Sequence, residues 1–165
     1  MEFTLNKSIL YVAVLLTGLS AGLFYAWMVS VIPGTKRVGD LVYLEVMQSI
    51  NRAILNPGFY LIFFGSLLLL ASSTIQQYQI SVNLSFWLLL SAALSYLIGT
   101  VGVTMLGNVP LNEMLDKIDL TTLEPNQLYD IRIRFEPRWN QLHMFRTVFS
   151  VLAFSASLLA IIINK

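Results

Sequence analysis

Residues 53–112 contain no charged side chain over 60 consecutive positions. Two further blocks, residues 8–35 and 147–164, are uncharged over 28 and 18 positions. A helix needs about 20 apolar residues to cross the ~30 Å hydrocarbon core of a bilayer, so the longest block can cross it twice. These blocks predict an integral membrane protein, and they argue against an ordinary soluble enzyme.

Turn-forming residues divide the blocks into four spans within a single membrane domain of 165 residues. The connections before the second and fourth spans are long and carry apolar residues at helical spacing, which is typical of amphipathic helices. We therefore expect an all-α four-transmembrane-helix bundle with a short amphipathic helical cap on one side. The predicted spans are residues 9–32, 57–75, 84–106 and 139–163, and the predicted cap segments are residues 38–56 and 111–141.

The first cap segment is expected to bury one apolar face against the bundle or the membrane surface. Its polar residues Glu45, Ser49 and Arg52 share another face of the predicted helix. The expected apolar face consists of Val38, Val42, Val46, Ile50 and Ile54.

Net charge and cysteine content argue against several classes of binding partner and cofactor. The formal net charge is +1, from ten basic and nine acidic residues, so the sequence offers no electrostatic case for nucleic acid. Cysteine is absent, which removes disulfides and thiolate sites. His143 is the only histidine, and no carboxylate lies within a predicted span, so we expect no metal site. His143 could supply an axial ligand to haem, but nothing else selects haem, and we expect no cofactor.

The distribution of basic residues predicts an orientation. The two connections on the cap side carry seven Lys and Arg residues, whereas the opposite side carries only Lys7 and Lys165. Basic loops favour the cytoplasm, so we expect both termini outside, in the cell (inner) membrane. The same connections carry eight of the nine acidic residues, which weakens this bias.

One stripe of the fourth span carries the side chains best suited to chemistry. Its members follow one another at steps of four, three and four residues, so they should share one helix face. They are Trp139, His143, Arg146 and Ser150. His143 is a candidate general base, although a histidine that caps a helix would look the same. Arg146 is a candidate oxyanion partner, or a side chain that snorkels to a lipid phosphate.

Residues from two other spans should approach this stripe. Asn108 and Asn112 follow the end of the third predicted span, where they are either site residues or helix punctuation. Tyr25 and Trp27 lie at about the same depth in the first span and could supply flat aromatic walls. We expect one cavity that opens towards the cap, with Tyr25 or Trp27 on its wall. Its lining should comprise Asn108, Asn112, Trp139, His143 and Arg146.

Three stretches carry a resemblance to a known family. They are Gly107-Asn108-Val109-Pro110-Leu111-Asn112, Met47-Gln48-Ser49-Ile50-Asn51 with Asn56-Pro57, and Trp139-Asn140 with His143 and Arg146. Over about residues 10–163 the sequence resembles the anthrone oxygenase-like family of small four-span membrane proteins, most of whose bacterial members have no assigned function.

The resemblance implies that some members oxidise an anthrone, a tricyclic phenolic ketone, to the quinone with O2 and without a known cofactor. The positions that it implies for the site are Asn108, Asn112, Trp139, His143 and Arg146. The chemistry is physically reasonable, because a base that removes an activated C–H proton leaves a carbanion able to react with O2. Its enolate oxygen would need stabilisation.

Three functions stay open at this point. The first is an oxygenase or oxidoreductase that acts on a small lipophilic, aromatic molecule at the lipid boundary. The second is a non-enzymatic binding or accessory protein that holds a quinone-like or lipid ligand. The third is a small transporter, which the lack of carboxylates within the spans disfavours. The sequence fixes neither the substrate nor the oligomeric state.

Overall fold

The computed structural model describes residues 5–163, and every regular element in that range is a helix. Four stretches are long and apolar enough to cross a membrane: Lys7–Thr35, Pro57–Ile80, Leu84–Asp116 and Pro125–Ile163. The prediction of an all-α, four-span membrane bundle is therefore confirmed. In chain order the elements are α1 (Leu5–Ala26), η1 (Trp27–Val31), α2 (Ile32–Thr35), α3 (Asp40–Ala53), α4 (Pro57–Ile80), α5 (Leu84–Leu94), η2 (Ser95–Gly102), η3 (Thr104–Asn108), α6 (Val109–Asp116), η4 (Leu120–Thr122) and α7 (Pro125–Ile163).

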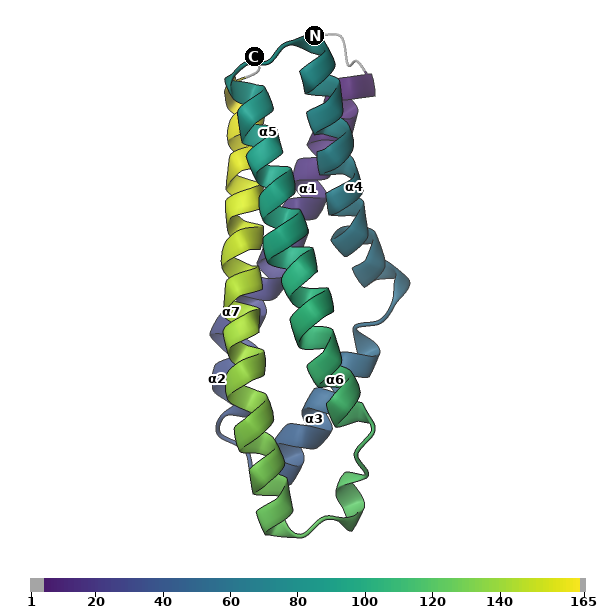
Figure 1. Ribbon diagram of the computed structural model, residues 1–165, viewed down its shortest axis with the longest axis vertical. Helices are drawn as coiled ribbons and strands as arrows, with labels where there is room; N and C mark the ends of the chain where they lie inside the picture. The colour runs from purple at the N-terminus through teal and green to yellow at the C-terminus, as the bar shows by residue number, and fades with distance from the viewer. Residues whose placement is uncertain (1–4, 164–165) are drawn as a thin grey trace.

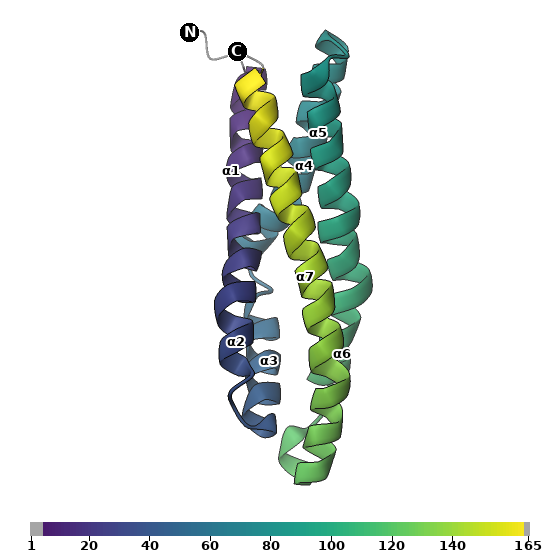
Figure 2. The same cartoon turned by 90° about the vertical axis from the view of Figure 1, so that its left-hand side faces the viewer.

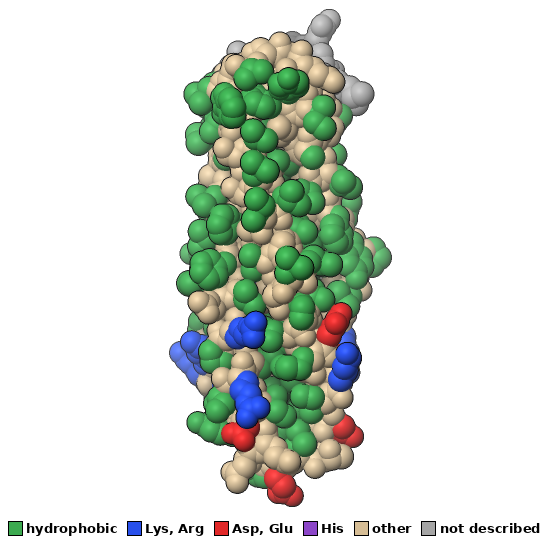
Figure 3. Space-filling model, viewed as in Figure 1, with side chains coloured by type: hydrophobic (Ala, Val, Ile, Leu, Met, Phe, Trp, Pro, Cys, Tyr) green, Lys and Arg blue, Asp and Glu red, His purple; other side chains and the backbone are tan. Residues whose placement is uncertain are grey.

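The bundle is an elongated rod with its described ends and the α4–α5 turn at one end (Figure 1). α1 packs against α4 and α7, and α5 packs against α7 and α4. At the opposite end α3, α6, η4 and the beginning of α7 lie together, and we call this assembly the cap (Figures 1 and 2). Charged side chains gather at the cap end of the face in Figure 3, whereas the rest of that face is largely hydrophobic.

The second span is longer than predicted at its C-terminal end. α4 continues through Gln76–Gln79 to Ile80, because uncharged glutamines are good helix formers and do not end a helix. The turn lies instead at residues 81–83. Asn83 then caps α5 by accepting a hydrogen bond from the backbone N–H of Phe86.

The third and fourth spans also exceed their predicted limits, because Gly107 and Pro137 do not interrupt them. Gly107 lies within the π-helical turn η3, has no positive φ angle, and leads directly into α6. Its missing side chain makes room for Leu142, which lies 2.9 Å from where a Cβ would be. α7 runs without a break from Pro125, well before the predicted start at Trp139, through Pro137 to Ile163.

α3 forms where the sequence predicts a cap helix, but it buries a different face. Its buried residues are Tyr43, Leu44 and Met47, whereas Val42 is 47% exposed. The predicted stripe advanced by four residues at each step, and each such step overshoots one turn by about 40°. A strict series of that kind therefore winds around the helix and cannot remain on one face.

Arg132 of α7 anchors α3 to the bundle. Its guanidinium bonds to Asp40 Oδ1 at 3.0 Å, Val38 O at 2.7 Å and Glu136 Oε2 at 2.8 Å. It also lies over the ring of Tyr43, 4.5 Å from the centroid. Burial, with a smaller effect from Glu136, raises the pKa of Tyr43 above its ordinary range. The cap is thus a packed layer with its own apolar core.

Candidate functional site

The candidate site is a small cavity where the bundle meets the cap. It has a volume of about 60 Å³ and lies between α1, η1, α3 with its following loop, the third span and α7. We call it the inner cavity. Its lining comprises Leu23, Phe24, Trp27, Ile50, Asn51, Ile54, Leu55, Thr104, Val109, Asn112, Trp139, His143 and Arg146.

His143 is fully buried, and both of its ring nitrogens have partners. Nε2 lies 3.0 Å from the backbone oxygen of Phe24, which can only accept a hydrogen bond, so Nε2 carries the proton. Nδ1 then has the free lone pair and accepts from Arg146, whose Nε and Nη2 lie 3.0 Å and 2.8 Å away. His143 is therefore held as the neutral Nε2–H tautomer with its basic nitrogen covered.

Arg146 is 8% exposed and has no carboxylate within ion-pair distance in the described part of the chain. Apart from Nδ1 of His143, its guanidinium reaches Thr104 Oγ1 at 3.5 Å. Aromatic rings supply the remaining contacts, since the guanidinium carbon lies 4.7 Å from the Phe24 centroid and 5.2 Å from that of Trp139. Cation–π contacts offset part of the cost of burying this charge.

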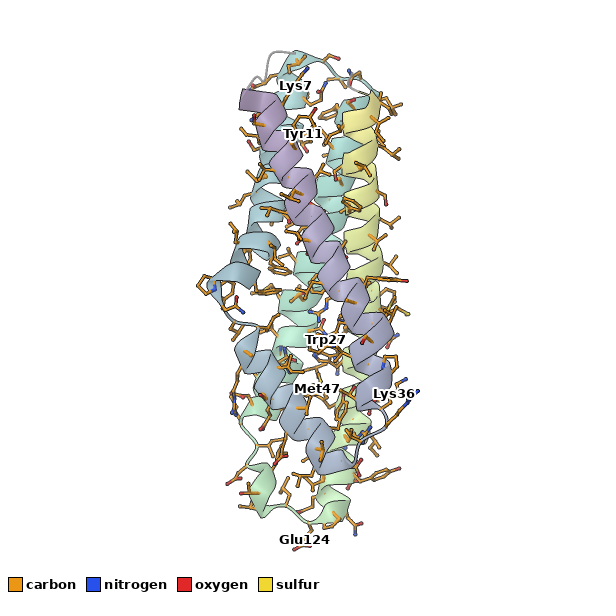
Figure 4. The ribbon with its side chains drawn as sticks, turned by 180° about the vertical axis from the view of Figure 1, so that it is seen from behind. Lys7, Tyr11, Trp27, Lys36, Met47 and Glu124 are labelled. Atoms are coloured by element: carbon orange, nitrogen blue, oxygen red, sulfur yellow. The ribbon has the colours of Figure 1, made fainter. Side chains whose placement is uncertain are left out.

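Trp139 and Trp27 form the aromatic walls. The Trp139 ring stacks on His143 at 5.1 Å with an interplanar angle of 6°, and its Nε1 donates to Asn112 Oδ1 at 2.7 Å. Trp27 lies 5.8 Å from Trp139 and 6.3 Å from His143, between ring centroids. Figure 4 shows Trp27 on the bundle side of Met47, at the junction with the cap.

Asn108 lies behind the cavity and does not line it. It is fully buried, and its Nδ2 donates to the backbone oxygen of Trp139 at 3.2 Å. Its Oδ1 is buried and has no hydrogen-bond partner. Asn108 therefore supports Trp139, whereas Asn112 reaches the cavity itself.

Tyr25 lies outside the site, and Trp27 is the one of the two expected aromatic residues that lines the cavity. It is 53% exposed on the outer side of α1. Phe24, one residue earlier, occupies the inner face, with its ring centroid 6.0 Å from that of His143. Consecutive helical residues point about 100° apart, so Phe24 and Tyr25 cannot both face the cavity.

Sequence reasoning missed several residues of the cavity lining, among them the aromatic Phe24 and the polar Thr104 and Asn51. Phe24 participates through its backbone oxygen as well as its ring, and a backbone contact leaves no signature in residue identity. Thr104 looks like one of many hydroxyl residues in a membrane helix. Asn51 is the one of the three that the sequence could have indicated, because it is a polar residue next to the apolar Ile50. In the structure it faces the cavity.

A second hollow adjoins the inner cavity. This outer pocket, of about 130 Å³, lies between α3 and α6 and shares Asn51, Leu55, Val109 and Asn112 with the inner cavity. Its remaining lining residues are charged, and two of them, Arg52 and Asp116, form an ion pair across it. The two hollows thus lie next to each other, between the charged surface of the cap and His143.

A larger groove of about 510 Å³ lies elsewhere, on the outer face between the third span and α7. Apolar residues and glycines line it, including Leu97, Leu106 and Leu142. A groove of this composition suits lipid chains, and it lacks polar groups that could orient a reacting molecule. In residues 5–163 no cluster of three or more His, Asp and Glu side chains is placed to hold a metal ion.

The fold and the site define a small four-span membrane bundle with a buried His–Arg pair at the junction with its cap. The family model for anthrone oxygenase matches residues 59–156, which include most of α4, the third span and the stripe on α7. The chain belongs to the anthrone oxygenase family. No curated protein and no solved structure matches it.

Proposed function

We propose that this protein oxidises a lipophilic, aromatic, anthrone-like substrate with O2 at the inner cavity. Membership of the family supports the oxygenase class. The observation that carries the proposal is the pairing of a neutral imidazole with a buried guanidinium beside aromatic walls. A base and an oxyanion partner side by side are what carbanion formation next to a carbonyl requires.

The proposed reaction converts the CH2 group of an anthrone and one O2 into a C=O group and one water. Removal of the first C–H proton gives a delocalised enolate, which transfers one electron to O2. The resulting radical and superoxide combine to form a peroxide anion at that carbon, which takes up the first proton again to become a hydroperoxide. Removal of the second C–H proton then breaks the O–O bond, and the departing hydroxide leaves as water after protonation. O2 takes up all the electrons that the substrate loses.

Each site residue has a defined task in this proposal. Arg146 moves from Nδ1 of His143 to the enolate oxygen and stabilises its charge, which uncovers Nδ1 to accept a proton. Trp139 and Trp27 hold the flat ring system by stacking. The amide nitrogen of Asn112 donates a hydrogen bond to no described residue, so it can donate one to a second substrate oxygen. Asn108 is a positioning residue, because it fixes the backbone of Trp139.

An aromatic substrate is larger than the inner cavity in this structure. Pockets for molecules of this size usually have volumes of roughly 300–1,000 Å³. We propose that the reacting edge enters the inner cavity and that the rest occupies the outer pocket, with Leu55 displaced from their shared wall. The outer pocket lies on the cap side of the inner cavity, so in this proposal the substrate enters from the cap.

For the orientation, we propose that the cap faces the cytoplasm of the cell (inner) membrane and both termini face outside. The charge asymmetry of the connections supports it. Because the chain has no cysteine, single cysteines at Gly34, Ser81 and Glu124 can each be labelled with an impermeant maleimide. Glu124→Cys and Gly34→Cys should react only after permeabilisation, and Ser81→Cys in intact cells. The reverse pattern would refute the orientation and leave the fold unaffected.

A second function is favoured by one observation. Nδ1 of His143 is covered by Arg146, so in this arrangement it is not available as a base. A protein that only holds a quinone or another lipophilic oxygenated ligand would have no need of one. Consumption of O2 separates this binding or accessory role from catalysis.

The test of the proposed function is turnover with heavy-isotope-labelled O2. Anthrones oxidise slowly without a catalyst, so protein in lipid nanodiscs is compared with empty nanodiscs and with heat-denatured protein. We expect one labelled oxygen atom in the quinone and an O2 uptake equal to the anthrone consumed. A rate equal to that of empty nanodiscs, with anthrone-like ligands still bound, would favour the binding protein instead.

A further inference from the structure

We infer that the inner cavity binds its aromatic ligand as an anion, a phenolate or enolate, and that this anion is the missing partner of Arg146. The inference rests on the proposed function only for the aromatic nature of the ligand. Its evidence is the contrast between Arg132 and Arg146, neither of which is exposed.

Arg132 shows how this protein normally satisfies a guanidinium. Its side chain is 12% exposed and has two carboxylate partners, Asp40 and Glu136. Backbone oxygens, among them that of Val38, take further N–H groups. This arginine therefore has neutralising charges and more than enough acceptors.

Arg146 is comparably buried but has neither a carboxylate partner nor enough hydrogen-bond acceptors. A guanidinium has five N–H donors, and here Nε and Nη2 share one neutral acceptor, Nδ1 of His143. Nη1 reaches Thr104 Oγ1 at 3.5 Å, and that hydroxyl already donates to the backbone oxygen of Thr100. A buried charge without a counter-charge is strongly unfavourable, and within a membrane span such a residue marks a functional site.

The inner cavity adjoins this charge and adds a second unsatisfied donor. Asn51 Nδ2 is buried at the wall shared with the outer pocket and has no hydrogen-bond partner. No Asp or Glu lines the inner cavity, so nothing there repels an anion. A flat ligand with a negative oxygen at Arg146 and another oxygen at Asn51 would satisfy both groups, while Trp139 contacts its face.

This recognition has a consequence for the reaction. An oxyanion that draws Arg146 onto itself also uncovers Nδ1 of His143, so ligand binding and release of the base are one event. Nδ1 then accepts the first C–H proton as the enolate forms and returns it to the peroxide anion. It is free again to accept the second C–H proton when the O–O bond breaks.

The probe for this inference is 2-hydroxyanthraquinone, whose phenolate absorbs at longer wavelength than its phenol and which has no CH2 group to oxidise. In wild-type protein the bound probe should ionise at least about one pH unit below the probe in empty nanodiscs, as expected beside an unpaired guanidinium. The non-ionisable 2-methoxyanthraquinone should bind without a pH dependence. This comparison requires no variant.

Variants then test which residue causes the shift in the ionisation of the probe. Arg146→Gln should abolish the shift and weaken binding of the phenolate at least about tenfold, and Arg146→Lys should keep the shift because it keeps the charge. Asn51→Leu should weaken both probes and leave the ionisation midpoint unchanged. Ser150→Ala is the matched control, because Ser150 is buried on the same stripe but does not line the cavity.

A probe bound in its neutral form to wild-type protein would overturn the inference, and so would a shift that persists in Arg146→Gln. These outcomes are independent of turnover. A clear shift with no O2 uptake would refute the proposed oxygenase and retain the anion site. Normal O2 uptake without a shift would refute the anion site and retain the proposed oxygenase.

Discussion

Arg146 Nη2 lies 2.8 Å from Nδ1 of His143, one helical turn earlier on α7. The guanidinium can cover the basic nitrogen of the imidazole or bind a substrate oxygen, and the same N–H groups cannot do both. In the proposed mechanism the two residues therefore act as one unit, in which the position of Arg146 controls the availability of His143.

Substitutions in this unit should be strongly non-additive. His143→Gln and Arg146→Gln should each lower turnover of an anthrone by a factor of about 10²–10⁴, the usual contribution of a general base. The double variant should be little worse than the weaker single variant, because each loss already disables the unit. Steady-state O2 uptake measures the cycle. Ser150→Ala should retain wild-type turnover, and additive losses in the double variant would argue against a coupled pair.

The proposed path through the outer pocket can be closed covalently. Arg52 and Asp116 approach each other across that pocket, from α3 and α6. In an Arg52→Cys/Asp116→Cys variant, a short cleavable bis-maleimide should slow binding of 2-hydroxyanthraquinone at least about tenfold. Cleaving the linker should restore the rate, so the same sample serves as its own control. An unchanged rate would mean that the ligand enters from the lipid side.

The cap should depend on Arg132. Arg132→Ala leaves Asp40 and Glu136 without their shared partner, and we expect a loss of about 1–3 kcal/mol in the free energy of unfolding. The α3 region should also become sensitive to proteases at Arg52. Thermal unfolding and limited trypsin digestion in detergent measure the two effects. Arg134→Ala, two residues away and exposed, is the control. Equal behaviour of both variants would contradict the anchoring role.

The stripe on α7 could be predicted from the sequence, because steps of four, three and four follow the helical period. Trp139, His143, Arg146 and Ser150 are all buried. The four spans could be predicted because long uncharged blocks have few alternatives. Their limits could not, since Gly107 and Pro137 are tolerated in membrane helices whose neighbours and local π-turns compensate.

The contacts inside the site could not be predicted from residue identities alone. The acceptor for His143 is the backbone oxygen of Phe24, and the choice between Phe24 and Tyr25 for the inner face depends on the rotation of α1. The lack of a carboxylate near Arg146 is likewise visible only in three dimensions. Composition indicates few acidic residues, but not which arginine is left without one.

Close packing of the third span on α7 should limit substitution at Gly99. A Cβ there would lie 2.0 Å from Phe149 Cγ, so Gly99→Ala must displace that ring. We expect a loss of about 1–3 kcal/mol in stability from overpacking. Gly22→Ala is the matched control, because beyond the neighbouring backbone of its own helix no atom lies within 4 Å of the added Cβ. Thermal unfolding in detergent should separate the two variants, and equal stabilities would show that the helices are not in contact at Gly99.

The most direct test of the whole account is the structure of the protein with 2-hydroxyanthraquinone bound. The account predicts that a ligand oxygen lies within about 2.7–3.2 Å of the Arg146 guanidinium, with Nδ1 of His143 uncovered and the ring system against Trp139. A ligand located instead in the outer groove beside Leu97 and Leu142, with Arg146 still on Nδ1, would contradict it.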